Sequence, residues 1–471
     1  MAVVPTDITE PAGVPLEPRE GLAPVAVADA REAAHLVRDS LGRTIARVAL
    51  PAVASSLLMT LFASADAFWV GTRLGADGLA AVSTSLFWIW MIVALAEMIG
   101  VGLTAVAARR HGEGRRTEAA RVAGDALLFT VALGIVIAAL GTLVLPALFD
   151  VMHTPQQVTR LGLRYLGTYL LGTPFIYGFF AVDASFRASG DTRTPFWLLA
   201  ISVAVTLLLD PALILGLGPF PRLGIAGAAI ATVCTRGAVF AMGLTMLVRR
   251  RLIRFGPPRV ANVSAVCRVG LPTAVTGIVF SLIYVAVTRT TTRFGTPALA
   301  ALGIGHRVES WLFMVGVGFG AATAAIVGQN LGAGQTLRAE RAGWLAVAFC
   351  SALGLVACLG DLAYAETLAA LFTSDPAVIA EAARYLRIAA ISQLCICAEI
   401  VLEGALGGAG ETLAPMVAST TFTALRIPLV SVAADRWGSA GIWWTISVTA
   451  IGRALAMVGL WRHGRWKRKS L

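Results

Sequence analysis

Two carboxylates lie deep inside apolar segments that are long enough to cross a membrane. Asp66 lies 15 residues after Pro51, and Asp210 lies 15 residues after Pro195. At a helical rise of ~1.5 Å per residue, both acids would lie about 22 Å from the starts of their helices. An acid at bilayer depth costs about 2.5–3.5 kcal/mol or more, so it needs a function or a partner. We predict that Asp66 and Asp210 bind a coupling ion, and a purely structural polar role is the alternative for each.

Two carboxylates at one depth, if they face each other, would not both stay ionised, because burial and mutual repulsion favour the protonated form. Asp183 is a third candidate for ion coupling, although it could instead be a boundary residue close to Arg187. Thr206 lies one helical turn before Asp210. We predict that Thr206 and Tyr165 belong to a substrate-binding or polar network in this half of the chain.

The second half of the chain carries a different set of charges. Glu399 and Glu403 are one helical turn apart and would face the same way. Arg426 lies about halfway along a later apolar segment and is a candidate counter-ion, and Glu309 lies in a polar cluster with His306. We predict that these residues contribute to substrate binding or to a polar network; a structural ion-pair network is the alternative for the Glu309 cluster.

The composition is that of an integral membrane protein. Of 471 residues, 57% are hydrophobic and only 14% are charged, and the mean hydropathy is +0.78. The net charge of +11 does not indicate nucleic-acid binding, because many basic residues fall in short clusters between apolar segments. The sequence has no HExxH, DDxxD or GxSxG motif. Neither catalysis nor a cofactor is therefore expected, only a coupling ion.

About twelve apolar stretches have membrane-crossing length. The basic clusters lie between the second and third stretches, between the sixth and seventh, and after the last, which predicts that both termini are cytoplasmic. The stretches run approximately over 46–73, 79–108, 121–147, 157–188, 195–217, 224–248, 269–293, 298–328, 341–371, 378–408, 414–434 and 438–461.

The two halves repeat each other at a fixed spacing. Four kinds of position recur 220 residues later: Gly75 with Gly295, Gly112 and Gly114 with Gly332 and Gly334, Tyr165 with Tyr385, and the Gly190-Asp191-Thr192 turn with Gly410-Glu411-Thr412. Because each half holds about six helices, both halves enter the membrane from the same side. We predict an all-α membrane protein of two parallel six-helix repeats, related by a pseudo-two-fold axis along the membrane normal.

The predicted organisation has five parts. They are a flexible cytoplasmic tail over 1–44, an amino-terminal six-helix lobe over 45–254, a cytoplasmic linker over 255–267, a carboxy-terminal six-helix lobe over 268–462, and a basic cytoplasmic tail over 463–471.

With these residues in hand, the chain resembles the multidrug and toxic compound extrusion (MATE) family, particularly its prokaryotic DinF-like branch. The likeness covers about 45–462 and depends on the order of several motifs. They are Leu50-Pro51 with Asp66, RASGDTRTP at 187–195, LLLDPALILGLG at 207–218, GIAGAAIAT at 224–232 and GQNLGAG at 328–334.

The resemblance implies an antiporter that exports organic cations or other amphipathic compounds in exchange for protons or sodium. In similar proteins, the acids that match Asp66 and Asp210 form a cation site in the amino-terminal lobe. Many relatives carry Asn where this chain has Thr206. The segment-seven acid of some relatives is missing, because Ala286 and Val287 stand at its place in the repeat. We therefore expect proton coupling rather than sodium coupling.

The expected partners are small amphipathic or cationic molecules and membrane lipids, and the chain is expected to be a monomer in the inner (plasma) membrane. The alternative is a lipid-linked precursor or polysaccharide flippase of related architecture. A flippase would be expected to have a strongly cationic central cavity, and Arg307 and Arg426 keep that alternative open.

Overall fold

The computed structural model describes residues 36–151 and 156–469, with only the backbone described for 63–77, 79, 80, 83, 86, 87, 151 and 285. Every regular element in this part of the chain is a helix. The first half contains α2 (Leu41–Gly112), α3 (Arg116–Val151), α4 (Gln156–Leu171), α5 (Thr173–Ser189), α6 (Arg193–Leu215) and α7 (Ile225–Arg249). The second half contains α8 (Val260–Thr291), η1 (Thr292–Phe294), α9 (Gly295–Gly332), α10 (Thr336–Ala370), α11 (Pro376–Gly408), α12 (Leu413–Ala424), α13 (Arg426–His463) and η2 (Arg465–Arg468).

Helix α2 provides two membrane spans. Its 72 residues would extend about 108 Å in a straight helix. Both of its ends nevertheless lie against neighbouring residues of α9. Asn330 Nδ2 donates to the carbonyl oxygen of Leu36, just before α2, over 3.2 Å, and Gly112 packs on the backbone of Gln329. The element therefore folds back on itself, and its apolar arms Leu41–Phe62 and Trp88–Gly112 correspond to the first two predicted spans.

The described helices account for the twelve predicted spans. Nine are long and apolar enough to cross a membrane, or ten if α4 and α5 together form one span. Two of these stretches each contain two spans. The stretch Val260–Gly332 contains α8 and α9 with η1 between them. The stretch Leu413–His463 is broken at Gly438, where φ is 64°. Dividing each of the two brings the number of spans to twelve.

The fourth predicted span is not one straight helix. Helices α4 and α5 meet at Gly172 with a bend of 50°. Pro174, in the first turn of α5, has no N–H to continue the hydrogen bonding of α4. The equivalent position in the second half is Leu394, and α11 runs through it unbroken. The two repeats therefore differ at the middle of this span.

The contact between the two halves has the reciprocity of a two-fold axis. Gly112 of α2 packs against the carbonyl oxygen of Gln329 on α9, and Gly332 of α9 packs against the carbonyl oxygen of Arg109 on α2. Each residue of one contact is the 220-residue counterpart of a residue in the other. Such self-complementary pairing is what a two-fold relation between parallel repeats requires.

Left-handed glycines at equivalent turns support the same relation. Gly114 and Gly334 both have φ of 75°, and Gly218 and Gly438 have φ of 63° and 64°. This region of φ favours glycine because it has no Cβ. The second pair extends the repeat beyond the positions that the sequence comparison identified.

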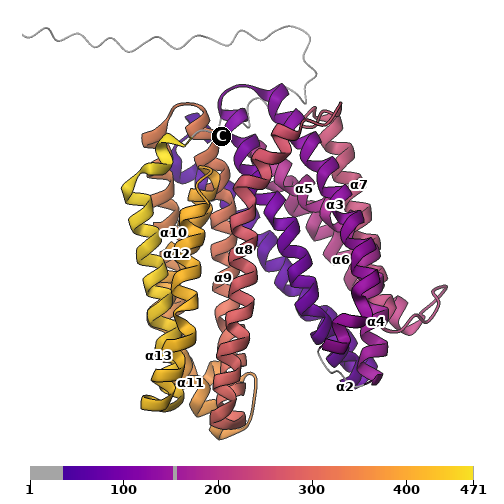
Figure 1. Cartoon of the computed structure of the whole chain (residues 1–471), viewed down its shortest axis with the longest axis vertical. Helices are drawn as coiled ribbons and strands as arrows, with labels where there is room; N and C mark the ends of the chain where they lie inside the picture. Colours follow the sequence, from indigo (N-terminus) through magenta and orange to yellow (C-terminus); the bar gives the residue numbers. More distant parts are fainter. Residues whose placement is uncertain (1–35, 152–155, 470–471) are drawn as a thin grey trace, which may run out of the picture.

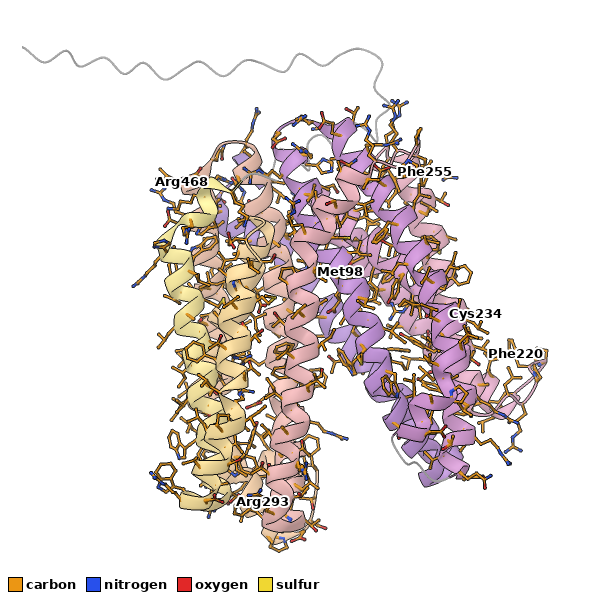
Figure 2. The ribbon with its side chains drawn as sticks, viewed as in Figure 1. Met98, Phe220, Cys234, Phe255, Arg293 and Arg468 are labelled. Carbon is orange, nitrogen blue, oxygen red and sulfur yellow. The ribbon has the colours of Figure 1, made fainter. Side chains whose placement is uncertain are left out.

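The helices form two bundles that pack at one end and diverge at the other, with α2–α7 in one and α8–α13 in the other (Figure 1). The packed end includes Phe255 and Arg468, whereas Phe220 and Arg293 lie at the opposite ends of the two bundles (Figure 2). All three basic clusters belong to loops or termini at the packed end. The predicted lobe boundaries themselves stay a prediction.

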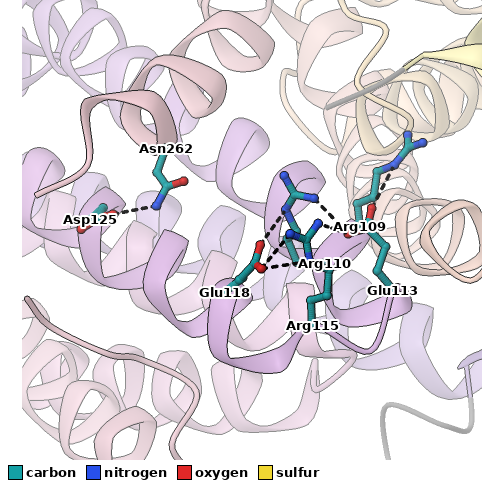
Figure 3. A network of polar contacts seen from close by, with 7 residues as sticks. All are labelled: Arg109, Arg110, Glu113, Arg115, Glu118, Asp125 and Asn262. Atoms are coloured by element: carbon teal, nitrogen blue, oxygen red, sulfur yellow. Dashed lines mark hydrogen bonds and ion pairs between the residues drawn. The ribbon is translucent and has the colours of Figure 1, made fainter.

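Charged loop residues and one part-buried hydrogen bond between the bundles stabilise the packed end (Figure 3). Glu113 accepts from Arg110 Nη1 over 2.9 Å and from Arg115 Nη1 over 3.3 Å. Burial raises the pKa of the Glu113 carboxyl, but these arginines lower it by more, so its pKa lies below its usual range. Asn262 Nδ2 of α8 donates to Asp125 Oδ2 of α3 over 2.7 Å, which joins the two bundles directly.

Small residues bring α9 and α11 into backbone contact within the second bundle. A methyl group at Gly404 would overlap the carbonyl oxygen of Gly320, and one at Gly408 would overlap that of Ala324. Small residues four apart allow helix backbones to approach closely in a membrane. This packing fixes the position of α11, which carries Glu399 and Glu403.

We expect Gly404→Ala to destabilise the protein by about 1–3 kcal/mol, because the added methyl group meets rigid backbone rather than a movable side chain. Gly303→Ala on α9 is the matched control, since a methyl group there has open space around it. Denaturation in detergent measures both. Equal free energies of unfolding for the two variants would show that the α9–α11 contact is not tight.

Candidate functional site

Asp210 and Thr206 lie on the buried side of α6. Asp210 is fully buried and Thr206 is 1% exposed. The hydroxyl oxygen of Thr206 lies 2.8 Å from that of Thr235 on α7, which is hydrogen-bond distance. A buried carboxylate therefore follows, by one helical turn, a hydroxyl pair that joins α6 to α7. Its predicted role in binding an ion stays a prediction.

Asp66 lies outside the residues whose side chains the structure describes. It follows Phe62 by four residues in α2. Its partnership with Asp210 therefore stays a prediction.

Asp183 on α5 forms an ion pair within its own helix. Arg187 Nε donates to Asp183 Oδ1 over 3.1 Å, and Arg187 Nη2 contacts Oδ2. Arg236 on α7 also interacts with Asp183 electrostatically. The structure thus contains the pairing with Arg187 that the sequence offered as the alternative to ion coupling.

Arg236 lies in the interior of the first bundle and is only 6% exposed. Its Cζ lies 5.7 Å from the ring centroid of Phe62 on α2 and 5.1 Å from that of Phe179 on α5. Its Nη2 donates to Met59 Sδ over 3.1 Å. Three helices of the bundle therefore position one guanidinium group.

The repeat-related tyrosines have different surroundings. Tyr165 on α4 packs in an apolar cluster that includes Ile214 and Ile225. Tyr385 on α11 interacts with Glu309 through its hydroxyl, and its ring lies 4.9 Å from that of Trp443. The polar network predicted around Glu309 thus includes Tyr385.

The direct counter-ion of Glu399 is Arg453, which the sequence analysis did not identify. Arg453 Nε lies 3.3 Å from Glu399 Oε1; Glu399 is buried and the Arg453 side chain is 12% exposed. Arg426, the predicted counter-ion, acts on Glu399 at longer range. Its own hydrogen bonds go from Nε to Thr449 Oγ1 over 2.7 Å and from Nη2 to the carbonyl oxygen of Ile446 over 3.4 Å.

Glu403 lies one turn further along α11. It interacts electrostatically with both Glu399 and Arg453. One arginine therefore compensates two neighbouring carboxylates, which agrees with the expectation that the two glutamates face the same way.

A second group of acids in this bundle surrounds Glu309. Its Oε2 lies 3.8 Å from His306 Nδ1, and the His306 ring stacks on Tyr284 with centroids 4.6 Å apart. Asp361 on α10 is 4% exposed, accepts a hydrogen bond from Gln393 over 3.3 Å and interacts electrostatically with Glu309. This cluster contains a second carboxylate that the sequence analysis missed.

Arg453 and Asp361 could have been found by the signal that identified the other candidates. Each is an ionisable residue in the interior of a predicted span, 438–461 for Arg453 and 341–371 for Asp361.

In both bundles, then, carboxylates are held inside membrane-length helices next to arginines or hydroxyl groups. Such groups can take up and release a proton without further chemistry.

Comparisons with known proteins agree with this architecture. The MatE family model matches residues 51–212 and 272–432, one block in each half. A probable multidrug resistance protein NorM of Deinococcus radiodurans is 31% identical over 433 residues, which cover 88% of this chain and 94% of the relative. An FAD transporter of Shewanella oneidensis is 27% identical over 427 residues, covering 89% of this chain and 94% of the relative.

Two solved structures share the fold. A mutant of the Vibrio cholerae MATE transporter VcmN aligns with a TM-score of 0.84 and 22% identity over 93% of this chain and 100% of that one. A MOP superfamily transporter from Pyrococcus furiosus aligns with a TM-score of 0.85 and 21% identity over 93% of this chain and 98% of that one. The twelve-helix architecture predicted from the sequence is thereby confirmed.

Proposed function

Since the chain belongs to the MatE family of membrane transporters, we propose that it is a secondary antiporter that exports organic cations or other amphipathic compounds in exchange for protons. The observation that carries this proposal is Asp210, a fully buried carboxylate on the membrane-length helix α6. A carboxylate at such a place is costly while charged, and either a proton or a cationic substrate relieves that cost. The two ligands therefore compete for one site, which is the requirement for exchange.

In this proposal, Asp66 and Asp210 carry the coupling proton. Asp183 is the third candidate for ion coupling, although Arg187 already pairs with it. The network residues Thr206, Tyr165, Glu309, Glu399, Glu403 and Arg426 shape the surroundings of the substrate in the two lobes. Sodium is the less favoured ion, because Ala286 and Val287 replace the segment-seven acid of some relatives.

We place the packed end, which carries the basic clusters, in the cytoplasm of a cell with the chain in its inner (plasma) membrane. The bundles diverge at the opposite end (Figure 1), so the arrangement corresponds to an outward-facing state. Transport would then proceed by rocking of the two lobes, in a carrier that acts as a monomer. The comparisons do not favour the flippase alternative, and the buried Arg426, one of the two arginines that kept it open, already has hydrogen-bond partners in the protein.

A vesicle experiment tests the proposed function. Purified protein is reconstituted into liposomes loaded with ethidium, and a proton gradient or a sodium gradient of equal size is imposed. We expect saturable ethidium movement that reverses with the direction of the proton gradient and is several-fold slower with sodium alone. Movement that is independent of both gradients, or that does not saturate, would rule out an antiporter.

A further inference from the structure

Arg236 has unused hydrogen-bonding capacity in the interior of the first bundle. The side chain is 6% exposed, and its Nη1 has no hydrogen-bond partner among the described residues. Its Nη2 donates only to the thioether sulfur of Met59, which is a weak acceptor. Leaving a buried charged donor unsatisfied is costly, so this group is suited to an additional acceptor.

The protein supplies no close carboxylate to fill this role within the described part of the chain. Asp183 acts on Arg236 electrostatically, but Arg187 forms the direct ion pair with Asp183. Tyr169 also interacts with Arg236, and its hydroxyl is neutral near pH 7. Among the residues whose side chains the structure describes, the guanidinium therefore keeps Nη1 as a donor without a hydrogen-bond partner.

Aromatic rings determine which kind of ligand fits beside that donor. The guanidinium lies over the rings of Phe62 and Phe179. Met59 is 37% exposed, and its unbranched, flexible side chain can move away from Nη2 at low cost. A ligand that displaces Met59 would meet two guanidinium nitrogens and an aromatic wall together.

We propose that Arg236 binds an oxyanion, such as a phosphate monoester, that is attached to a planar aromatic ring system. The substrates of this carrier then include anionic or zwitterionic aromatic compounds besides organic cations, a conclusion that rests on the proposed transport function. The oxyanion accepts from Nη1 and Nη2 in the paired geometry that arginine offers to phosphate, and the ring system packs against Phe62 and Phe179.

Riboflavin and flavin mononucleotide test the proposal, because they share the ring system and differ by one phosphate. Equilibrium binding of each to the full-length protein in nanodiscs is followed by flavin fluorescence. We expect wild-type protein to bind flavin mononucleotide roughly tenfold more tightly than riboflavin, as a charge-assisted hydrogen-bond pair would provide. In Arg236→Gln this preference should fall below about twofold.

Arg293→Gln is the charge-matched control, because Arg293 is 62% exposed at the end of the second bundle, and it should keep the preference. If Arg236→Gln does not fold, Arg236→Lys is tested in its place. Its preference for flavin mononucleotide over riboflavin should fall at least roughly threefold from the wild-type value, because lysine lacks the paired donors of arginine. Equal binding of both flavins by wild type, or a preference that survives the change at Arg236, would overturn the proposal. No gradient is involved, so this outcome is independent of the antiport experiment.

Discussion

Asp66→Asn will reduce proton-driven ethidium efflux to the level of protein-free liposomes, a loss of at least roughly tenfold, because an amide can neither carry nor release the coupling proton. The substitution keeps the size of the side chain and removes a charge that is costly at bilayer depth. The protein should therefore still fold. Initial efflux rates in proteoliposomes and elution during size-exclusion chromatography measure the two effects.

The matched control for this prediction is Asp375→Asn. Asp375 is exposed and caps α11 by accepting a hydrogen bond from Ala377 N over 2.9 Å. Asparagine caps helices about as well as aspartate does, so this variant should transport normally. Asp210→Asn should match the loss seen in Asp66→Asn, and the double variant should be no worse, since both acids are proposed to act as one unit. Full efflux by Asp66→Asn would contradict the proposed coupling site.

Arg453→Met will lower the free energy of unfolding by about 3–5 kcal/mol, because it leaves Glu399 buried without its direct counter-ion. Glu403 loses the same neighbour, so two carboxylates are affected by one change. Glu399→Gln combined with Arg453→Met should restore part of the stability, since Glu399 then carries no unpaired charge and only Glu403 still lacks the neighbouring arginine. Unfolding in mixed detergent micelles measures all three proteins.

Arg293→Met is the comparison for this second prediction. Arg293 lies 3.9 Å from Asp435, and both side chains are more than half exposed. Exposed ion pairs contribute about 0–1 kcal/mol, so this variant should unfold almost like wild type. If Arg453→Met and Arg293→Met unfold alike, Arg453 is not the structural partner of the two glutamates.

Several features of the fold were predictable because they depend on local sequence. The apolar stretches gave the membrane spans, and the 220-residue repeat gave the two related halves. The repeat-related glycines at these spacings include Gly114 and Gly334, which share the same left-handed conformation. Burial of Asp210 followed from its position deep inside an apolar stretch.

Other features were not predictable from the order of residues. The bend at Gly172 interrupts a stretch that reads as one apolar span, although Pro174 provides its local cause. Arg426 was the predicted counter-ion, because it lies about halfway along its apolar segment. The structure places Arg453 closer to Glu399 instead, since the rotation of α13 about its own axis determines which side chains face α11.

The sequence by itself thus determined the class of protein, its twelve spans and its internal symmetry, because hydrophobicity, turn residues and repeats are local properties of the chain. Only the tertiary structure decided which charges meet. Asp183 pairs with Arg187, Glu399 pairs with Arg453, and Arg236 lies beside two aromatic rings with Nη1 unpartnered among the described residues. Such pairings depend on the angles and rotations at which helices pack, and these are set by contacts between residues that are far apart in the chain.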